Sequence, residues 1–435
     1  MNLYLIYLIP LLIILWVYQR RRKRRETQDV HQLNEAIQSG LIEPPSLHPV
    51  VDPIRCIGSS SCVTACPEQA LGIIKGKAQL INPAACIGHG ACFAACPVDA
   101  IKLVFGTERR GMDIPLVDPN FETSVPGLFI AGELGGMGLI RKAAEQGKQA
   151  IASMQKFGKR NTKENASAEY DAVIVGAGPA GLAAGLGAME RKMKYVLIEQ
   201  EDGLGGSIYH YPRNKIAMTA PVILPLVGKI RFNEVSKEAL LSFWQDIVRK
   251  TGLKVSFSER MESITPEKGV FLVKTSRTTY RSKAVLLAIG RRGTPRKLGT
   301  PGEELPKVVY RLLDAEQYAG QKVLVVGGGD SALEAALACA DQPRTKVTLS
   351  YRGEAFGRVK AKNRTRIEEA QKKARINVLL RSNVLEIREH EVSLEQDGAP
   401  VSLPNDVVII SAGGVLPSDF LKSIGVQIET KFGTK

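Results

Sequence analysis

A cysteine-rich passage occurs twice in this 435-residue chain and constrains the fold more than any other feature. Both copies have the spacing Cys-x5-Cys-x3-Cys-Pro, and they start thirty residues apart. Zinc sites usually pair their cysteines as Cys-x2-4-Cys, which is absent here, and disulfides are disfavoured in a cytosolic protein. The spacing therefore favours a metal cluster. Six of the seven cysteines lie in these boxes: Cys56, Cys62, Cys66, Cys86, Cys92 and Cys96.

The doubled box resembles a bacterial-type two-cluster ferredoxin. In that family thiolates hold cuboidal iron–sulfur clusters, and the last cysteine of each box ligates the cluster of the other box. The resemblance implies two iron–sulfur clusters, each of the three-iron or four-iron type, with three thiolates assigned to each. The first set is Cys56, Cys62 and Cys96, and the second set is Cys86, Cys92 and Cys66.

Each box departs from the ferredoxin pattern at one position. Where the pattern has a further cysteine, this chain has Ser59 in the first box and His89 in the second. A three-iron cluster needs only three thiolates, whereas a four-iron cluster would bind Ser59 oxygen, His89 nitrogen or solvent at its fourth iron. An imidazole ligand would change the charge of the cluster and hence its reduction potential. His89 lies between two glycines, so a plain loop residue is the alternative.

The N-terminus combines an apolar stretch, Leu3 to Tyr18, with six consecutive basic residues, Arg20 to Arg25. The stretch is shorter than the roughly 20 residues that span a bilayer, but thinning and snorkelling would let it cross. No charge precedes it and no small-residue cleavage site follows, which argues against a cleavable signal peptide. The positive-inside rule then predicts a single-pass helix in the inner (cytoplasmic) membrane, with the catalytic domains in the cytoplasm. An interfacial anchor on anionic lipid is the alternative.

A glycine motif typical of dinucleotide binding follows the apolar residues that start near Tyr170. Its spacing, Gly-x-Gly-x-x-Gly at 176–181, permits a tight turn, close approach of a pyrophosphate and close helix–strand packing. The helix N-terminus holds the phosphates, and Glu199, 23 residues after Gly176, is expected to bind a ribose. A Gly-Gly-Ser sequence at 205–207 follows, as in flavoproteins where this loop lies along the flavin. The residues expected to bind this nucleotide are Gly176, Gly178, Pro179, Ala180, Gly181, Glu199 and Gly206.

A second glycine motif, with Ala332 at its third small position, opens at residue 327. The next expected strand ends in Ser-Tyr-Arg at 350–352 and carries no acidic residue. Loss of the carboxylate and gain of arginine favour NADPH over NADH, because the 2′-phosphate requires a cation. Lys360 and Lys362 are further candidates, and an ordinary solvated charge is the alternative for the arginine. The residues expected to bind this nucleotide are Gly327, Gly329, Asp330, Ser331 and Arg352.

The two motifs together resemble the flavoprotein disulfide reductase superfamily, closest to its thioredoxin reductase branch. The crossover AVLLAIGRRGTPRKLGTPGEE at 284–304 and the loop GGGDSALEAA carry the resemblance, which covers roughly residues 113–435. It implies FAD and NADPH as cofactors and a homodimer, which is common among relatives. The redox CxxC of the branch is absent, and Cys339 stands alone in an expected helix as a buried apolar residue. A dithiol thioredoxin reductase is therefore excluded.

The segment that closes over the flavin in this superfamily stands in an unusual place. It is similar to DPNFETSVPGLFIAGE at 118–133, which precedes the first glycine motif instead of ending the chain. We interpret this as a circular permutation, with Gly132 and Glu133 at the flavin and Glu133 in place of the family's aspartate. The helix that follows, with Arg141 in its first turns, would direct its N-terminus at the flavin. The permutation predicts that about Gly111 and Lys435 are close in space, on one sheet of the FAD lobe.

These patterns predict an α/β and α+β multidomain chain with an N-terminal membrane helix. A dicluster ferredoxin-like domain and two Rossmann-like domains complete it. The expected domains are a transmembrane anchor (1–19), a basic run and tether (20–50), a dicluster ferredoxin domain (51–108), a permuted flavin-closing segment (109–160), an FAD-binding domain (168–295), an NAD(P)-binding domain (296–404) and a return to the FAD domain (405–435). A polar linker is expected at 161–168.

The expected function is electron transfer among NADPH, FAD, two iron–sulfur clusters and an unknown partner, in either direction. No catalytic acid or base is required, because the cofactors carry the chemistry. The alternatives are a flavin-dependent reductase of a small disulfide, persulfide or quinone, and a redox sensor without turnover. The expected partners are the lipid bilayer, an electron-transfer partner and a second copy of the chain. Nucleic acid is not expected despite the net charge of +15, because the basic run adjoins the apolar stretch and no nucleic-acid motif occurs.

Overall fold

The computed structural model divides the chain into two compact units. The first consists of Met1–Gly111, Ala355–Thr365 and Phe432–Lys435, and the second of Met112–Glu354 and Arg366–Lys431. His89, Lys360, Lys435 and residues 161–166 of the expected linker lie outside the described residues. The described residues are 3–38, 44, 47–86, 88, 90–108, 111–136, 139–160, 167–211, 213, 216–218, 221–232, 234–267, 269–291, 293–357, 359 and 361–433.

Short elements around the cysteine boxes form the body of the first unit. They are β1 (His48–Val51), α2 (Ser61–Thr64), β2 (Leu71–Ile74), β3 (Lys77–Leu80), η1 (Pro83–Ala85), α3 (Ala91–Ala94) and β4 (Ile101–Val104). The strand before the first box, β1, pairs antiparallel with β4, the strand after the second. β2 and β3 form an antiparallel hairpin between the boxes, and α2 contacts α3. The two boxes therefore face each other across one small core.

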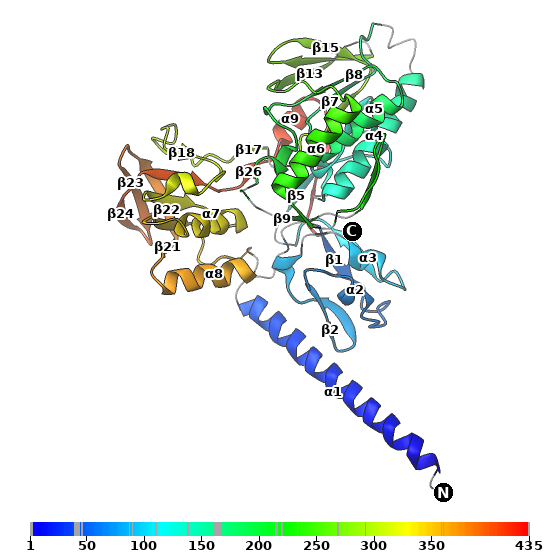
Figure 1. The fold of residues 1–435 in the computed structure, drawn as a ribbon, viewed down its shortest axis with the longest axis vertical. Helices are drawn as coiled ribbons and strands as arrows, with labels where there is room; N and C mark the ends of the chain where they lie inside the picture. Colours follow the sequence, from blue (N-terminus) through cyan, green and yellow to red (C-terminus); the bar gives the residue numbers. More distant parts are fainter. Residues whose placement is uncertain are drawn as a thin grey trace. The chain divides into compact units, whose positions relative to one another are not determined.

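A long helix, α1 (Leu3–Gln38), precedes this body, and its second half is fixed to the hairpin (Figure 1). The Asp29 carboxylate accepts a hydrogen bond from the Ile73 amide at 2.8 Å, and the Glu26 carboxylate accepts one from Lys75 at 2.7 Å. Gly72 permits this approach, since an added Cβ would lie 2.6 Å from Asp29 Cγ. The acidic side chains of α1 thus occupy amide donors along one edge of β2.

The predicted membrane anchor is not supported by the structure. The apolar stretch ends at Tyr18, and the same helix continues through the basic residues 20–25 to Gln38. A helix needs about 20 apolar residues to span a bilayer, and no helix in the described part of the chain is long and apolar enough to do so. The expected membrane helix at 1–19, and the single-pass inner-membrane location inferred from it, are therefore wrong.

The second unit contains a four-stranded parallel sheet in the order β6-β16-β7-β8. Its strands are β6 (Leu128–Ile130), β7 (Ala172–Val175), β8 (Tyr195–Ile198) and β16 (Val285–Leu287). Each strand is a continuous apolar run, as expected for a sheet covered on both faces. Helix α5 (Pro179–Glu190) connects β7 to β8, and α4 (Ile140–Arg160) packs along it (Figure 1).

Further elements complete this lobe around the four-stranded sheet. The antiparallel sheet β13-β14-β15 lies between β8 and β16 in the sequence, as do two short antiparallel strand pairs and one helix. The bounds are η3 (Gly206–Ile208), β9 (Ile216–Met218), β10 (Val222–Leu224), β11 (Gly228–Ile230), β12 (Glu234–Ser236), α6 (Lys237–Thr251), β13 (Met261–Glu267), β14 (Val270–Thr275) and β15 (Thr279–Ser282).

A second parallel sheet has the order β18-β25-β19-β20-β21, with α7 packed on β19 and β20. Its last strand in the sequence, β25, spans residues that the sequence analysis assigned to the return toward the FAD domain. The bounds are β18 (Val308–Val309), η4 (Glu316–Tyr318), β19 (Lys322–Val326), α7 (Asp330–Ala340), β20 (Lys346–Tyr351), α8 (Ala361–Lys372), β21 (Ile376–Leu380), β22 (Ser382–Ile387), β23 (Glu391–Gln396), β24 (Ala399–Pro404) and β25 (Val407–Ile410). The chain crosses between the two lobes on the paired strands β17 (Thr294–Pro295) and β26 (Gly414–Val415).

The strand pairing confirms the predicted permutation. β6, from the segment that precedes the first glycine motif, lies at the edge of the first sheet and pairs in parallel with β16. After α9 (Ser418–Ser423), the strand β27 (Ile428–Lys431) pairs antiparallel with β5 (Met112–Pro115), with Lys431 opposite Met112. This pair forms a two-stranded sheet of its own. Segments from the two ends of the superfamily-like region are therefore neighbours, as a permuted chain requires.

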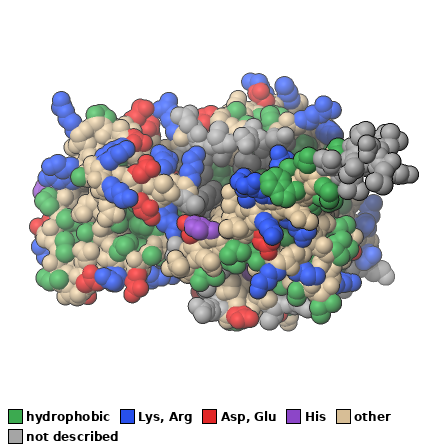
Figure 2. Space-filling view, turned by 90° about the horizontal axis from the view of Figure 1, so that it is seen from below, with side chains coloured by type: hydrophobic (Ala, Val, Ile, Leu, Met, Phe, Trp, Pro, Cys, Tyr) green, Lys and Arg blue, Asp and Glu red, His purple; other side chains and the backbone are tan. Residues whose placement is uncertain are grey.

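The surface charge is mixed on the face drawn in Figure 2. Lys and Arg side chains are scattered there among acidic and hydrophobic ones. Many of the basic groups form ion pairs, such as Lys283 with Asp171 at 2.6 Å and Arg249 with Asp246 at 2.7 Å. Exposed pairs of this kind contribute about 0–1 kcal/mol each, so they neutralise charge more than they stabilise the fold.

Candidate functional site

Cysteines from both boxes line one cavity in the first unit. Cys56, Cys62 and Cys96 lie around it, together with Ile73 of β2 and Ala78 of β3. Cys56 is 8% exposed and Cys62 is 7% exposed, so these sulfurs are largely shielded from water. This is the set that a ferredoxin-like crossing of the boxes assigns to the first cluster.

The remaining three cysteines of the boxes are divided between two buried apolar clusters. Cys66 and Cys86 lie in one buried apolar cluster with Ala70. Burial raises the pKa of the Cys92 thiol to about 11, and the negative charges of Cys86 and Cys66 add to this effect. The structure thus places Cys66 beside Cys86, whereas Cys92 packs in the apolar cluster that holds Cys56 and Cys62.

Both groups fit an iron–sulfur cluster because they supply shielded thiols and amide donors to sulfur. The Ala70 amide donates to Cys66 Sγ at 3.4 Å, and the Ala100 amide donates to Cys96 Sγ at 3.2 Å. Both amides belong to the fourth residue after the last cysteine of a box, so the two halves repeat the same contact. Hydrogen bonds to sulfur are one determinant of cluster potential. Burial raises the pKa of Cys62, Cys86 and Cys92, so a bound metal would have to replace the protons of these thiols.

Of the two candidate non-cysteine ligands, only Ser59 lies among the described residues. Ser59 is exposed in the turn between Cys56 and Cys62, lines the first cavity and has its hydroxyl 3.2 Å from that of Ser61. His89 is outside the described residues, so its ligand role stays a prediction. Within the described ranges, no three or more His, Cys, Asp or Glu side chains converge as ligands of a single metal ion. The iron–sulfur assignment therefore rests on the cysteine grouping and on the family comparison below.

The first glycine motif forms a loop that requires glycine at two positions. Gly176 has φ +102°, in the left-handed region, and an added Cβ would lie 2.6 Å from the Ala288 carbonyl oxygen. At Gly181 an added Cβ would lie 1.7 Å from the Gly176 oxygen, so helix α5 packs directly on the loop. Gly178 and Gly206 approach each other closely, since an added Cβ on Gly206 would lie 3.1 Å from Gly178 Cα. Because these glycines have no side chains, a ligand can approach the backbone of the loop closely.

One large cavity joins this loop to the permuted segment and to Glu199. Gly132 and Glu133 line it from the segment before α4, where the Gly132 amide donates to Gln146 Oε1 at 2.8 Å. Ile140 and Ala143 line it from the first turn of α4. From the first nucleotide fold come Gly176, Gly178, Pro179, Ala180, Glu199, Gly205 and Gly206. The cavity thus fits a long dinucleotide such as FAD, with one end at the acidic residue and the other near α4.

Glu199 is almost completely buried at 5% exposed, and both of its oxygens accept amide hydrogen bonds. Ala177 donates to Oε2 at 2.7 Å, and Glu201 donates to Oε1 at 3.1 Å. Burial raises the pKa of the Glu199 carboxyl, and these two donors oppose the rise. The carboxylate is therefore held at a fixed place beside the loop, where it can accept further hydrogen bonds from ribose hydroxyls.

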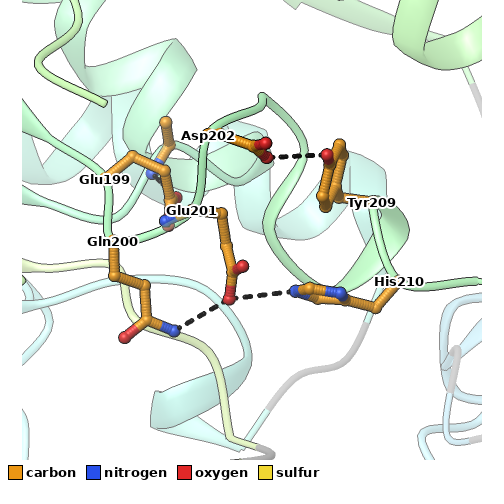
Figure 3. Close-up of polar contacts among 7 residues, drawn as sticks. Glu199, Gln200, Glu201, Asp202, Tyr209 and His210 are labelled. Atoms are coloured by element: carbon orange, nitrogen blue, oxygen red, sulfur yellow. Dashed lines mark hydrogen bonds and ion pairs between the residues drawn. The ribbon is translucent and has the colours of Figure 1, made fainter. Parts of the chain in front are cut away.

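A histidine–glutamate pair, which no sequence motif predicted, lies in the same cavity (Figure 3). His210 Nε2 lies 3.1 Å from Glu201 Oε1, which also accepts from Gln200 at 3.2 Å. Burial lowers the pKa of His210, the positive charge of Arg311 lowers it further, and Glu201 opposes both. A neutral imidazole is therefore favoured at neutral pH. The only sequence signal for His210 is its place three residues after the Gly-Gly-Ser loop, and Arg311 has no local signal.

The second glycine loop is partly covered by an aromatic ring. Gly327 has φ +147°, and an added Cβ would lie 2.4 Å from the Ser411 oxygen. The Tyr351 ring lies over Gly328, where an added Cβ would be 2.2 Å from it. An added Cβ on Gly329 would have no atom within 4 Å. Helix α7 begins at the next residue, Asp330, and Ser331 in its first turn is exposed. Arg352 is exposed at the end of β20, a position that suits the 2′-phosphate expected there.

Thiol chemistry is not available in the large cavity. None of the described residues that line it is a cysteine. Cys339 is 0% exposed in α7, and burial raises its pKa to about 12. This thiol is therefore an apolar core residue and not a nucleophile.

Comparison with known proteins supports both parts of the chain. A family model described as pyridine nucleotide-disulphide oxidoreductase matches residues 173–433, and one described as 4Fe-4S dicluster domain matches residues 48–97. The bacilliredoxin reductase Bdr of Bacillus subtilis is 27% identical over 60% of this chain and 82% of its own length. A ferredoxin–NADP reductase of Ignicoccus hospitalis is 29% identical over 60% of this chain and 83% of its own.

A solved structure gives the same result for the fold. The bacillithiol disulfide reductase Bdr of Bacillus cereus has a TM-score of 0.53 and 27% identity over 59% of this chain and 82% of its own. These comparisons confirm the predicted kinds of cofactor, which are FAD, NAD(P)H and iron–sulfur clusters. The chain belongs to the pyridine nucleotide-disulphide oxidoreductase family and is an NAD(P)H-dependent, FAD-containing oxidoreductase that also carries an iron–sulfur dicluster domain.

Proposed function

We propose that this enzyme moves electrons between NADPH and a one-electron carrier protein, using FAD and two iron–sulfur clusters. When bound, FAD exchanges electron pairs with a nicotinamide and single electrons with other centres, and the clusters carry single electrons. The observation that carries the proposal is the distribution of cysteines. Six lie in the dicluster domain, where five of them are buried, and no described residue of the FAD cavity is a thiol.

The parts of the chain have separate roles in this proposal. The loop at 176–181, Glu199 and Gly206 hold FAD, and Gly132 and Glu133 contact it from the permuted segment. The loop at 327–331 and Arg352 bind NADPH, with Arg352 on the 2′-phosphate. Similarity to a ferredoxin–NADP reductase supports an exchange between a nicotinamide and a ferredoxin-type carrier, here joined to the ferredoxin-like domain in one chain.

The competing function is reduction of a small disulfide at the flavin, because a bacilliredoxin reductase is also among the relatives. That reaction needs a thiolate to attack the disulfide, or direct hydride transfer to sulfur. The FAD cavity offers no described cysteine for the first route, and Cys339 is fully buried. Electron transfer is therefore the better supported function.

The test is an anaerobic titration of the full chain with NADPH, following flavin absorbance and cluster EPR in the same samples. We expect both cofactors to be reduced, and reduction of a one-electron acceptor such as ferricyanide or a ferredoxin to follow. Cys62→Ala should abolish cluster signals and slow ferredoxin reduction at least 10-fold, whereas the control Cys339→Ala should change neither. Rapid disulfide turnover that persists in Cys62→Ala would refute the proposal in favour of the competing function.

A further inference from the structure

The basic run of α1 is unpaired at the surface of the first unit. All six residues at 20–25 are exposed, and in the part of the chain that the structure describes none of them forms an ion pair. The ion pair on this helix joins His31 to Glu35, after the run. The acidic residues nearest in the sequence, Glu26 and Asp29, accept backbone amides of the β2–β3 hairpin instead. The run can therefore attract a negatively charged partner.

The run reaches the wall of the cavity that holds the first set of cysteines. Arg22 lies at the tip of the β2–β3 hairpin, where an added Cβ on Gly76 would be 3.9 Å from its Nη2. The same tip meets the turn of the first box, since an added Cβ on Gly58 would lie 2.2 Å from the Gly76 oxygen. Gly58 lines the cavity together with Cys56 and Cys62. Only two close contacts therefore separate a guanidinium of α1 from this cavity.

Two exposed isoleucines and two lysines lie at the same wall. Ile54 is 91% exposed and Ile57 is 65% exposed, on either side of the buried Cys56 in the sequence. Lys75 is exposed next to the hairpin tip, and Lys77 Nζ donates to the Cys56 carbonyl oxygen at 2.6 Å. An apolar centre with a charged rim is typical of a protein docking site.

We call the surface made by Arg22, Ile54, Ile57 and Lys75 the first-cluster face. Its acidic neighbour Asp52 accepts the amides of Ile54 and Arg55 at 2.9 and 3.4 Å, and the Arg55 side chain is exposed beside it.

The charge near the other set of cysteines is different. Glu68 Oε2 lies 3.9 Å from Cys66 Sγ, and Cys66 belongs to the set predicted for the second cluster. The negative charge of Glu68 also acts on Cys86, where it is one cause of the raised pKa of that thiol. An acidic partner would therefore be repelled near the second set and attracted at the first-cluster face.

We propose that the first-cluster face is the docking site of an acidic one-electron carrier protein. The inference rests on the proposed function, because it specifies the charge of the carrier and the place where it binds. Unpaired cations steer an acidic protein toward the face, and the isoleucines give it apolar contact. A second copy of this chain does not suit the face, since its net charge of +15 would be repelled.

The electron step balances without a further reactant. One electron passes in each encounter between the carrier and the cluster held by Cys56, Cys62 and Cys96, so one is oxidised as the other is reduced. No bond forms or breaks, and no proton has to move. Two such encounters account for the electron pair of one NADPH.

The test measures binding without turnover, on the oxidised full chain. The probe is an oxidised two-cluster ferredoxin of net negative charge, and calorimetry gives its Kd at low and high salt. We expect Kd to rise at least 10-fold between about 0.05 and 0.5 M salt, because salt screens exposed charges. Cytochrome c, a basic one-electron carrier, is the control probe and should show no tighter binding at low salt.

A pair of double variants separates the face from the overall charge. Arg22→Gln combined with Lys75→Gln should raise Kd for the ferredoxin about 5-fold at low salt, as loss of two exposed charge pairs implies. The matched control combines Lys229→Gln with Lys250→Gln, two exposed lysines of the other unit, and should leave Kd unchanged. Both variants change the net charge equally, and iron and sulfide counts show whether each has kept its clusters.

Three results would overturn the inference. The first is a wild-type chain that does not bind the ferredoxin at low salt. The second is an equal loss of binding in both double variants, which would assign the attraction to net charge. The third is binding of duplex DNA or of phosphatidylglycerol vesicles without binding of the ferredoxin.

The inference and the proposed function can fail separately. A chain that passes the NADPH titration but does not bind the ferredoxin refutes only the docking face. A chain that binds the ferredoxin at this face but whose clusters are not reduced by NADPH refutes the proposed function and supports the face.

Discussion

The close packing of α4 against α5 can be tested with one added methyl group, in Gly147→Ala. Gly147 is buried in α4, and an added Cβ would lie 2.0 Å from the Ala180 oxygen and 2.7 Å from the Ala180 carbonyl carbon. Contacts between such atoms are normally about 3.5 Å, so the overlap exceeds about 1 Å and meets backbone, which cannot rotate away. The two helices must separate, and Ala180 lies in the FAD cavity.

The magnitude follows from two opposing effects. Overpacking costs about 1–3 kcal/mol, and the upper end applies to a backbone clash. Replacing glycine by alanine within a helix returns about 1 kcal/mol. The net loss of about 2 kcal/mol corresponds to a fall in melting temperature of about 4–8 °C. The same helix provides the matched control Gly158→Ala, whose added Cβ would meet only Lys283 Cδ at 3.7 Å, so its melting temperature should stay equal or rise slightly.

The assay is thermal unfolding followed by release of flavin fluorescence at a fixed FAD concentration, with bound FAD counted per chain. Fixing the concentration matters because FAD stabilises the folded state by mass action. We expect lower melting temperature and lower FAD content only for Gly147→Ala. If this variant melts at or above the wild type with full FAD content, the proposed contact between α4 and α5 is not as close as described and the reasoning fails.

Three further predictions concern single side chains. Glu201→Gln should lower the pKa of His210, because the carboxylate that favours the protonated imidazole is lost; an NMR pH titration showing no shift would contradict the pairing. Native protein treated with iodoacetamide near pH 8 should keep Cys339 unmodified by mass spectrometry, since its pKa is about 12, and labelling as fast as in unfolded protein would disprove burial. Arg352→Ala should raise KM for NADPH about 10-fold, as loss of a charged hydrogen bond implies, but leave KM for NADH nearly unchanged. An equal rise for both nucleotides would exclude Arg352 as the 2′-phosphate ligand.

Spacing within short segments was enough to predict much of this fold. The glycine motif predicted a tight turn and a close helix, and Gly176 and Gly181 occupy positions that exclude a Cβ. The misplaced closing segment predicted a permuted lobe, and the pairing of β5 with β27 confirms it. Such features can be predicted from the sequence because each depends on a few neighbouring residues or on one motif shared with the superfamily.

Features made by distant segments could not be read in this way. His210 meets Glu201 because the chain turns back after the Gly-Gly-Ser loop, and Arg311 reaches the same cavity from a separate part of the sequence. The membrane helix was predicted from the apolar stretch and its basic flank, and such local patterns do not reveal where a helix ends. In the structure the helix continues past the apolar residues, and Glu26 and Asp29 fix its second half to β2.

The β5–β27 pair also sets the order in which the protein can mature. Thr430 and Asp113, joined across this pair at 2.8 Å, are 317 residues apart in the chain. At about 5–20 residues per second, the ribosome needs roughly 15–60 s to synthesise the second strand after the first. The dicluster domain is complete in sequence by then, whereas the FAD lobe must wait for its last strand. Cluster assembly can therefore begin during translation, and stable closure of the flavin lobe comes after it.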